Sequence, residues 1–132
     1  MSSQTLTVDV PPGEWLTANG RYHWAERSRR TRALRARAAW LARRHSLPRM
    51  DGCVHVTAYI HTRTRGRMDP DNASPATKAI IDGLRDAGVL IDDDHEHLTG
   101  PDHRRGGAMP HLTTGWHRIT LHITNDEEHL HE

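Results

Sequence analysis

The stretch that decides the fold spans residues 68–98 and reads MDPDNASPATKAIIDGLRDAGVLIDDDHEHL. Ser74 followed by Pro75 predicts the start of a helix, because serine is a good N-cap and proline suits the first helical position. Apolar residues then gather on one side of the helical wheel, and Gly88 predicts the end of the helix. The sequence therefore predicts an amphipathic helix over residues 74–87.

Two groups of aspartates flank this predicted helix. Asp69 and Asp71 come before it, on either side of a proline, and residues 92–94 after it are all aspartate. Lys78 is the only lysine of the chain and lies on the helix between the two groups. On the helical wheel it shares a face with Asp82, away from the apolar side. We therefore expect the helix to point its lysine out of the core.

The rest of the chain predicts a small mixed sheet. Alternating apolar residues indicate four strands, and a longer apolar stripe of period 3.6 indicates one further helix. The expected strands are residues 4–10, 54–61, 98–103 and 117–123, and the further helix is residues 25–45. The order βαβαββ predicts an α/β (α+β) fold, with about four strands in a mixed sheet and two main helices.

Length and composition limit the class of protein. A chain of 132 residues corresponds to one domain, 1–132, whose polar end from residue 125 on we expect to be frayed. The single cysteine cannot form an internal disulfide, which favours a reducing, cytoplasmic setting. The sequence contains no apolar run of the roughly 18–20 residues that a membrane span needs. We expect no membrane partner.

The arginines indicate a polyanionic partner. More than half of the basic residues lie between positions 21 and 49, although the net charge is only +1. Arg30, Arg37 and Arg44 recur every seventh residue on the predicted long helix, and Arg65 and Arg67 come just before the first aspartates. Such a pattern suits phosphate contacts, while a solvated basic helix is the plainer alternative. Trp40, which lies among the helical arginines, we interpret as a core residue.

The aspartates suggest a metal site. Carboxylates that converge on one point repel each other unless a cation lies between them, and hard oxygen ligands suit Mg²⁺, for which Mn²⁺ can substitute. Such a site can activate water for the hydrolysis of a phosphodiester. Each group taken alone has a plainer interpretation, because Asp-Pro-Asp-Asn is a turn sequence and a run of aspartates is a polar loop. Two groups joined by one helix with the only lysine favour the metal site.

These residues resemble the RusA-like Holliday-junction resolvases, structure-selective endonucleases of phage and prophage origin. The resemblance covers most of the chain, and its specific positions are Asp69-Pro70-Asp71-Asn72, Lys78, Asp82, Leu84, Ala87-Gly88 and Asp92-Asp93. One departure is the distance from Asn72 to Lys78, which is six residues here and three in the family. The added three residues are close to one helical turn, so the lysine returns to a similar face.

The resemblance implies a function and a set of site residues. Asp69, Asp71 and Asp93 would hold the divalent metal, and Lys78 would act as the catalytic or phosphate-binding cation. The activity would be Mg²⁺-dependent resolution of four-way DNA junctions by paired symmetric nicks, in DNA recombination and repair. The expected partners are branched DNA and a second copy of the chain, because a two-fold dimer presents two equivalent sites to a nearly two-fold junction. The expected location is the cytoplasm, in association with the nucleoid.

Two other hypotheses remain open. The chain is rich in histidine, and His95 and His97 beside Asp94, together with Asp102 and His103, could bind Zn²⁺ or Ni²⁺. However, no cysteine pair or HExxH spacing supports zinc. The other hypothesis is a DNA-binding protein that has the fold without the enzyme activity.

Overall fold

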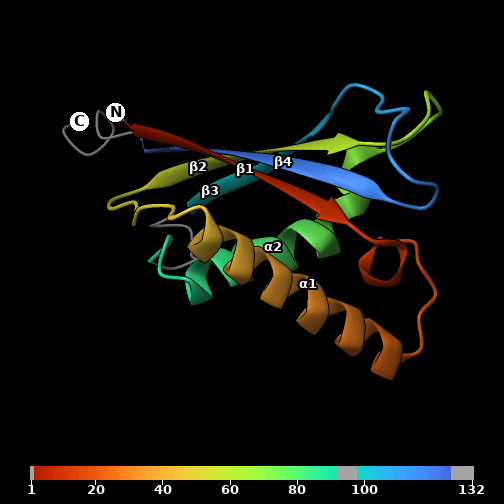
Figure 1. Cartoon of the computed structure of the whole chain (residues 1–132), viewed down its shortest axis with the longest axis horizontal. Coiled ribbons are helices and arrows are strands. Elements are labelled where there is room, and N and C mark those ends of the chain that lie inside the picture. The colour runs from red at the N-terminus through yellow and green to blue at the C-terminus, as the bar shows by residue number, and fades with distance from the viewer. Residues whose placement is uncertain (1, 92–97, 126–132) are drawn as a thin grey trace.

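The computed structural model describes residues 2–91 and 98–125 (Figure 1). Its elements in chain order are β1 (Ser2–Val10), the short 3-10 helix η1 (Pro12–Glu14), α1 (Trp24–Arg44), β2 (Val54–His61), the 3-10 helix η2 (Pro70–Ala73), α2 (Ser74–Asp86), β3 (Leu98–Arg105) and β4 (His117–Asn125). The predicted element order and the predicted α+β fold are confirmed.

The four strands form one mixed sheet in the order β1-β4-β2-β3. β4 runs antiparallel to both β1 and β2, whereas β2 and β3 are parallel. A parallel pair requires a crossover connection, and η2 and α2 lie in the segment between β2 and β3. Because the pair is parallel, β2 and β3 end at the same edge of the sheet. The segments that follow these two strands therefore meet there.

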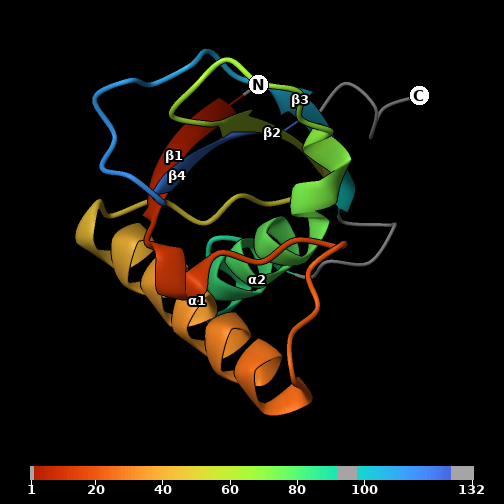
Figure 2. The same ribbon diagram turned by 90° about the vertical axis from the view of Figure 1, so that its right-hand side faces the viewer.

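Both helices cover one face of the sheet (Figures 1 and 2). The alternation in β2 explains why: Val54, Val56, Ala58 and Ile60 are buried, while the residues between them are partly exposed. Ile119, Leu121 and Ile123 of β4 repeat the pattern. The other face of the sheet is polar. The buried apolar side chains of the strands and helices form a single core.

Gly83 allows α1 and α2 to pack closely. A Cβ at this position would lie 2.4 Å from the carbonyl oxygen of Arg35 and 2.8 Å from the Cβ of Ala38. A bidentate ion pair closes the same interface, because Arg35 Nε lies 2.5 Å and Nη2 lies 2.7 Å from the Asp86 carboxylate oxygens. Arg35 lowers the pKa of Asp86 below its ordinary value, because its hydrogen bonds favour the charged carboxylate.

The outer side of α1 is polar and carries Trp40, whose exposed fraction is 60%. The interpretation of Trp40 as a core residue was therefore wrong: α1 buries Leu34, Ala38, Ala39 and Ala42 instead. In the part of the chain that the structure describes, no helix is both long enough and apolar enough to span a bilayer.

The element boundaries differ from the prediction at several places: β1 begins at Ser2 and not at residue 4, and α1 spans Trp24–Arg44 and not 25–45. Ala73 is the N-cap of α2, so that Ser74 is its first residue and Pro75 its second, because η2 continues directly into the helix. β3 extends beyond the predicted residue 103 to Arg105. Asn125, where we expected the frayed tail to begin, ends β4 and is 3% exposed. Residues 126–132 lie outside the described part of the chain.

Candidate active site at the ends of the parallel strands

The parallel pair β2 and β3 creates the candidate site. Backbone hydrogen bonds continue past the strands, from Gly106 N to Ile60 O at 2.8 Å and from Met109 N to Thr62 O at 2.8 Å. The segment that follows β3 is thereby fixed against the segment that leads from β2 to η2. In open sheets, ligands commonly bind beyond the carboxyl ends of parallel strands.

η2 presents the first pair of predicted carboxylates at this edge. Asp69 is its N-cap, and its Oδ1 accepts a hydrogen bond of 3.0 Å from Asp71 N. The Asp71 side chain is 80% exposed. The sequence Asp-Pro-Asp-Asn thus forms the capped turn that was the plainer interpretation, and the same turn carries Asp71 to the end of β3, where it contacts His103.

A buried histidine supports Asp71 from behind. The side chain of His103 on β3 is only 7% exposed, and its Nδ1 lies 3.3 Å from Asp71 Oδ1. Its Nε2 lies 2.8 Å from the hydroxyl of Thr77, which is fully buried on α2. The Thr77 hydroxyl also donates to the carbonyl oxygen of Ser74, 3.0 Å away, so the hydroxyl bridges the first turn of α2 and the His103 ring. His103 therefore links η2, α2 and β3.

Asn72 holds the segment before α1 against η2. Its side-chain Oδ1 accepts a hydrogen bond of 3.0 Å from Asn19 N, and its backbone carbonyl accepts one of 2.8 Å from Ala18 N. The asparagine of the Asp-x-Asp-Asn pattern is thus a positioning residue in this fold. The sequence analysis assigned it no role, since both partners lie more than fifty residues earlier in the chain.

Lys78 occupies the exposed side of α2, as predicted. Its Nζ lies 3.2 Å from Asp82 Oδ1, and Arg85 Nη2 lies 3.6 Å from the same oxygen. The side chain of Lys78 is 61% exposed and that of Asp82 is 14% exposed. The predicted polar face of α2 is confirmed, and it starts one turn after η2.

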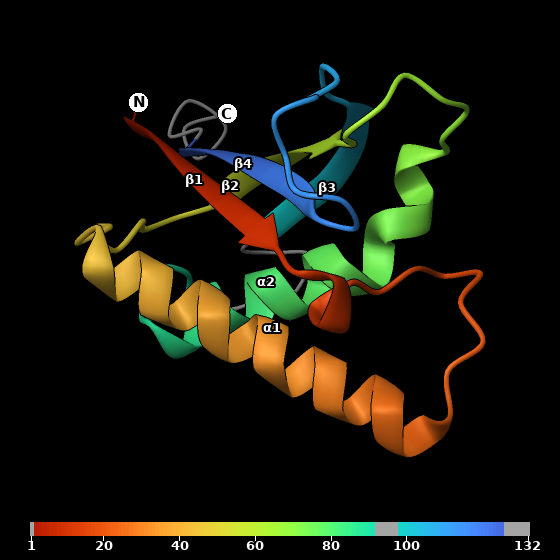
Figure 3. The same cartoon turned by 45° about the vertical axis from the view of Figure 1, so that its right-hand side comes forward.

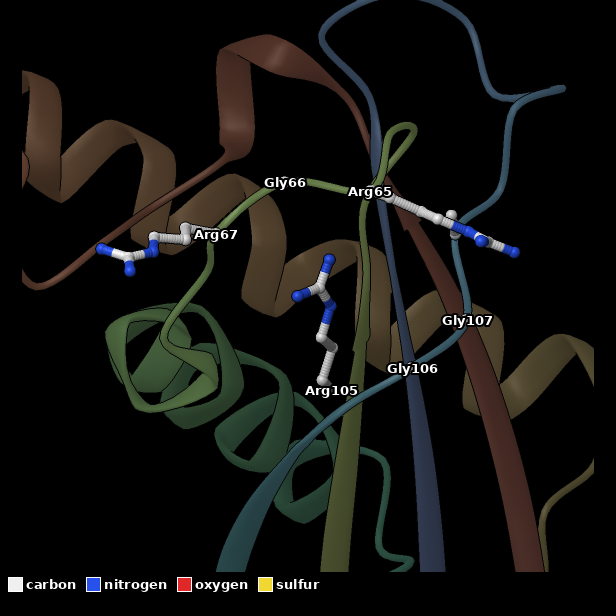
Figure 4. Close-up of a pocket in the computed structure, with 7 residues that line it drawn as sticks. Arg65, Gly66, Arg67, Arg105, Gly106 and Gly107 are labelled. Atoms are coloured by element: carbon white, nitrogen blue, oxygen red, sulfur yellow. The ribbon is translucent and has the colours of Figure 1, made fainter.

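Arg65 and Arg67 line an open hollow of about 580 Å³ at the strand edge. Arg105 and the backbone of Gly106 and Gly107 complete it (Figure 4). Sequence analysis did not select Arg105. Its only signal was a position at the end of a weakly predicted strand, and the parallel pairing that brings it beside the other two arginines is not visible in the sequence.

The arginines of α1 that form the seven-residue repeat have other contacts. Arg37 forms a bidentate pair with Glu14, with both distances 2.8 Å. Arg30 donates to Glu26 and to the carbonyls of Pro12 and Trp15. Hydrogen bonds from Arg29 and Arg30 lower the pKa of Glu26 to about 2. Two members of the repeat thus fasten α1 to the segment around η1.

Arg44, the third member of the repeat, is the last residue of α1 and is exposed. This end of α1 lies at the opposite end of the molecule from η2 (Figures 1 and 3). Arg67 lines a pocket together with Asp69, and Arg65 lines the adjoining hollow with Arg67, whereas Arg44 lies far from both.

The third predicted carboxylate, Asp93, lies outside the described residues, as do Asp92 and Asp94. Within residues 2–91 and 98–125, no group of three or more His, Cys, Asp or Glu side chains is arranged to hold a metal ion. Mg²⁺ is usually bound by one or two carboxylates together with water and substrate phosphate. Two aspartates such as Asp69 and Asp71 are therefore ligands of the right type and number for this ion.

Asp102 and His103, two residues of the alternative metal-site hypothesis, lie on opposite faces of the sheet. Asp102 faces away from the helices, where its Oδ2 lies 2.9 Å from Nε2 of His55. His103 faces the helices and contacts Asp71 and Thr77. Adjacent residues of a strand point to opposite faces, so Asp102 and His103 do not converge. His95 and His97 lie outside the described residues.

Fold and site together define an α+β protein with a mixed four-stranded sheet and paired carboxylates beside an arginine-lined hollow. No protein-family model matches the chain. The chain is 31% identical over 137 aligned residues to an uncharacterized protein of Xylella fastidiosa (strain Temecula1 / ATCC 700964). The match covers 97% of this chain and 85% of the relative. The chain belongs to the same family as that protein.

Proposed function

We propose that the protein is a Mg²⁺-dependent, structure-selective DNA endonuclease that resolves four-way junctions by paired symmetric nicks. The observation that carries this proposal is the pair of carboxylates on η2, presented at the edge where β2 and β3 end and next to exposed arginines. Acidic side chains beside a basic surface suit the two needs of phosphodiester hydrolysis, a bound cation and a held polyanion. The resemblance described above names the same residues.

Asp69, Asp71 and Asp93 would hold the metal, which when bound supplies an activated water and stabilises charge on the phosphodiester. His103 keeps the Asp71 carboxylate in place through its 3.3 Å contact. Asp69 is oriented by the backbone N–H of Asp71, which leaves its second oxygen for another partner. His103 ties η2 to α2 and β3, and this support would give the carboxylates the fixed geometry that catalysis needs.

Lys78 would place a positive charge on the non-bridging oxygens of the phosphate. In the free protein its ammonium contacts Asp82, 3.2 Å away. The long, exposed stem lets the ammonium leave Asp82 when a phosphate binds. The proposed active form is a homodimer, because paired nicks at one junction require two equivalent sites. Its proposed location is the cytoplasm, in association with the nucleoid.

The experiment is the nicking of a synthetic four-way junction in Mg²⁺ by the wild type and by Asp71→Asn. The variant keeps the size and polarity of the side chain and removes the charge, so we expect it to bind the junction and not cut it. Asp102→Asn is the matched control, because Asp102 is an exposed aspartate on the other face of the sheet. Cutting by Asp71→Asn at the wild-type rate would remove Asp71 from the mechanism.

The same assay separates the two alternative functions. A wild-type protein that binds junctions but leaves them uncut in Mg²⁺ and Mn²⁺ would be a non-catalytic DNA-binding protein. Cutting or binding supported only by Zn²⁺ or Ni²⁺ would favour the histidine-rich metal site. Full activity in Mg²⁺ alone would leave that site without a role in the reaction.

A further inference from the structure

The hollow at the strand edge has an unbalanced positive charge. Arg65, Arg67 and Arg105 are all exposed, and none of their guanidinium groups has a hydrogen bond or an ion pair to any residue in 2–91 or 98–125. On α1, by comparison, Arg35 and Arg37 each form a bidentate pair with a carboxylate, whereas the exposed Arg32 and Arg44 have no such pair within the described residues. The hollow is therefore the place where exposed guanidinium groups of this kind gather beside the carboxylates of η2.

Arg105 ends β3, and the segment that follows it is held in place. His61 Nδ1 lies 2.9 Å from the carbonyl oxygen of Gly107, and Gly106 N donates to Ile60 O. Gly106 also lies directly on the imidazole of His61, because a Cβ there would lie 2.3 Å from that ring. The side of the hollow that residues 105–107 form is thus in place before any ligand arrives, so little ordering of this segment has to accompany binding.

The three guanidinium groups are spread along the hollow. In Figure 4, Arg105 extends into the space between the two segments, while Arg65 and Arg67 leave their loop in opposite directions. A single small anion would need converging donors, whereas a row of phosphates suits donors that are spaced apart. The distribution of charge therefore favours a chain of phosphates over a single phosphate group.

The hollow leads to the carboxylates through Arg67. This residue also lines a neighbouring pocket of about 260 Å³, whose other lining residues include Asp69 and Asn72. A strand lying along the arginines would therefore continue past Arg67 to the carboxylate of Asp69. The order of residues along this path is Arg65 or Arg105, then Arg67, then Asp69.

We propose that the arginine hollow, defined by Arg65, Arg67 and Arg105, binds the sugar–phosphate backbone of one nucleic-acid strand. That strand runs onward to Asp69 and Asp71, so that the hollow holds the substrate on one side of the phosphate to be cut. The binding of a strand rests on the charges and shape of the hollow, and only the statement about the cut phosphate rests on the proposed function.

The test uses binding without catalysis. A fluorescent oligothymidylate of about twelve nucleotides is titrated with protein over a range of salt concentrations, with EDTA present. Arg105→Gln should weaken binding about five- to tenfold and reduce the slope of log K against log salt by about 0.7, the loss of one single-strand phosphate contact. Arg104→Gln is the matched control, because Arg104 is the preceding exposed arginine and pairs in register with Tyr59, on the other face of the sheet.

Three outcomes overturn the proposal: no binding by the wild type, no change with Arg105→Gln, or an equal change with Arg104→Gln. The junction-nicking assay separates this proposal from the proposed function. If the protein binds the oligonucleotide through Arg105 and never nicks a junction, the proposed strand binding is supported and the proposed endonuclease function is refuted. If the protein nicks junctions and Arg105→Gln changes nothing, the endonuclease function is supported and the proposed strand binding by the hollow is refuted.

Discussion

Removal of the His103 imidazole should raise the Mg²⁺ concentration that the nicking reaction requires without removing the reaction itself. His103→Ala takes away the group that lies 3.3 Å from Asp71 Oδ1 and connects it to Thr77. Asp69 still caps η2, so the carboxylates remain at the strand edge. The expected change is a less well oriented Asp71 and therefore a weaker hold on the metal.

The magnitude follows from the exposure of the two partners. Loss of a residue that orients a metal ligand commonly costs 10- to 100-fold in metal affinity. The Asp71 side chain is 80% exposed, so water replaces the lost partner and the lower value applies. We expect the half-saturating Mg²⁺ concentration to rise about tenfold, or about 1.4 kcal/mol of binding free energy. The free energy of unfolding should also fall by about 1–3 kcal/mol, because a buried hydrogen-bonded ring is removed.

The assay is initial-rate nicking of a four-way junction across a Mg²⁺ titration, at a temperature where circular dichroism shows both proteins folded. His55→Ala is the matched control, because His55 pairs with an aspartate on the opposite face of the sheet. Recovery of the His103→Ala rate at high Mg²⁺ is the predicted signature. A rate that is reduced equally at every Mg²⁺ concentration would refute the positioning role and leave His103 a purely structural residue.

Three further predictions concern stability and charge. Gly83→Ala should lower the free energy of unfolding by about 1–2 kcal/mol, since the new Cβ meets Arg35 O at 2.4 Å and overpacking outweighs the better helix propensity of alanine; urea denaturation measures it. Burial lowers the pKa of His117 below its ordinary 6.5, so the unfolded chain binds this proton more readily than the folded protein does. The free energy of unfolding should therefore fall as the pH drops below 6.5. His117→Asn should flatten that decline between about pH 7.5 and about pH 5.5 in the same urea measurement. Arg37→Gln should lower stability by about 1 kcal/mol through loss of its pair with Glu14 and leave the salt dependence of DNA binding unchanged; a flatter salt slope would show that Arg37 contacts DNA.

The strands and helices could be predicted because local periodicity encodes them. Alternation in β2 and the wheel of α2 each reflect one buried face, and both elements lie where the sequence places them. Gly88 ends α2 as predicted, with a φ of +80° that glycine adopts without strain. The pairing order β1-β4-β2-β3 was not predictable in this way, since it depends on contacts between distant segments.

The candidate site could be predicted only in part. Asp69, Asp71 and Lys78 were selected from residue type and spacing, and η2 and α2 place them as local structure would suggest. The support of Asp71 by His103 was missed, because the two residues are distant in the chain and meet only through the parallel pairing of β2 and β3.

The arginine repeat of α1 was read from spacing alone. Spacing shows that Arg30 and Arg37 share a helical face, and it does not show what that face meets. The structure provides partners from the segment around η1, notably the carboxylate of Glu14 for Arg37. Arg105 could not be selected for the opposite reason, because its neighbours in the hollow come from another segment of the chain.

The central claim is that Asp69, Asp71 and Asp93 bind one divalent metal ion together. The most direct measurement is the uptake of Mn²⁺ by the wild type and by the three single Asp→Asn variants, followed through the electron paramagnetic resonance signal of free Mn²⁺. The account predicts that the wild type and Asp102→Asn take up the ion and that each of the three variants binds it much more weakly. Uptake by Asp93→Asn equal to that of the wild type would contradict the account.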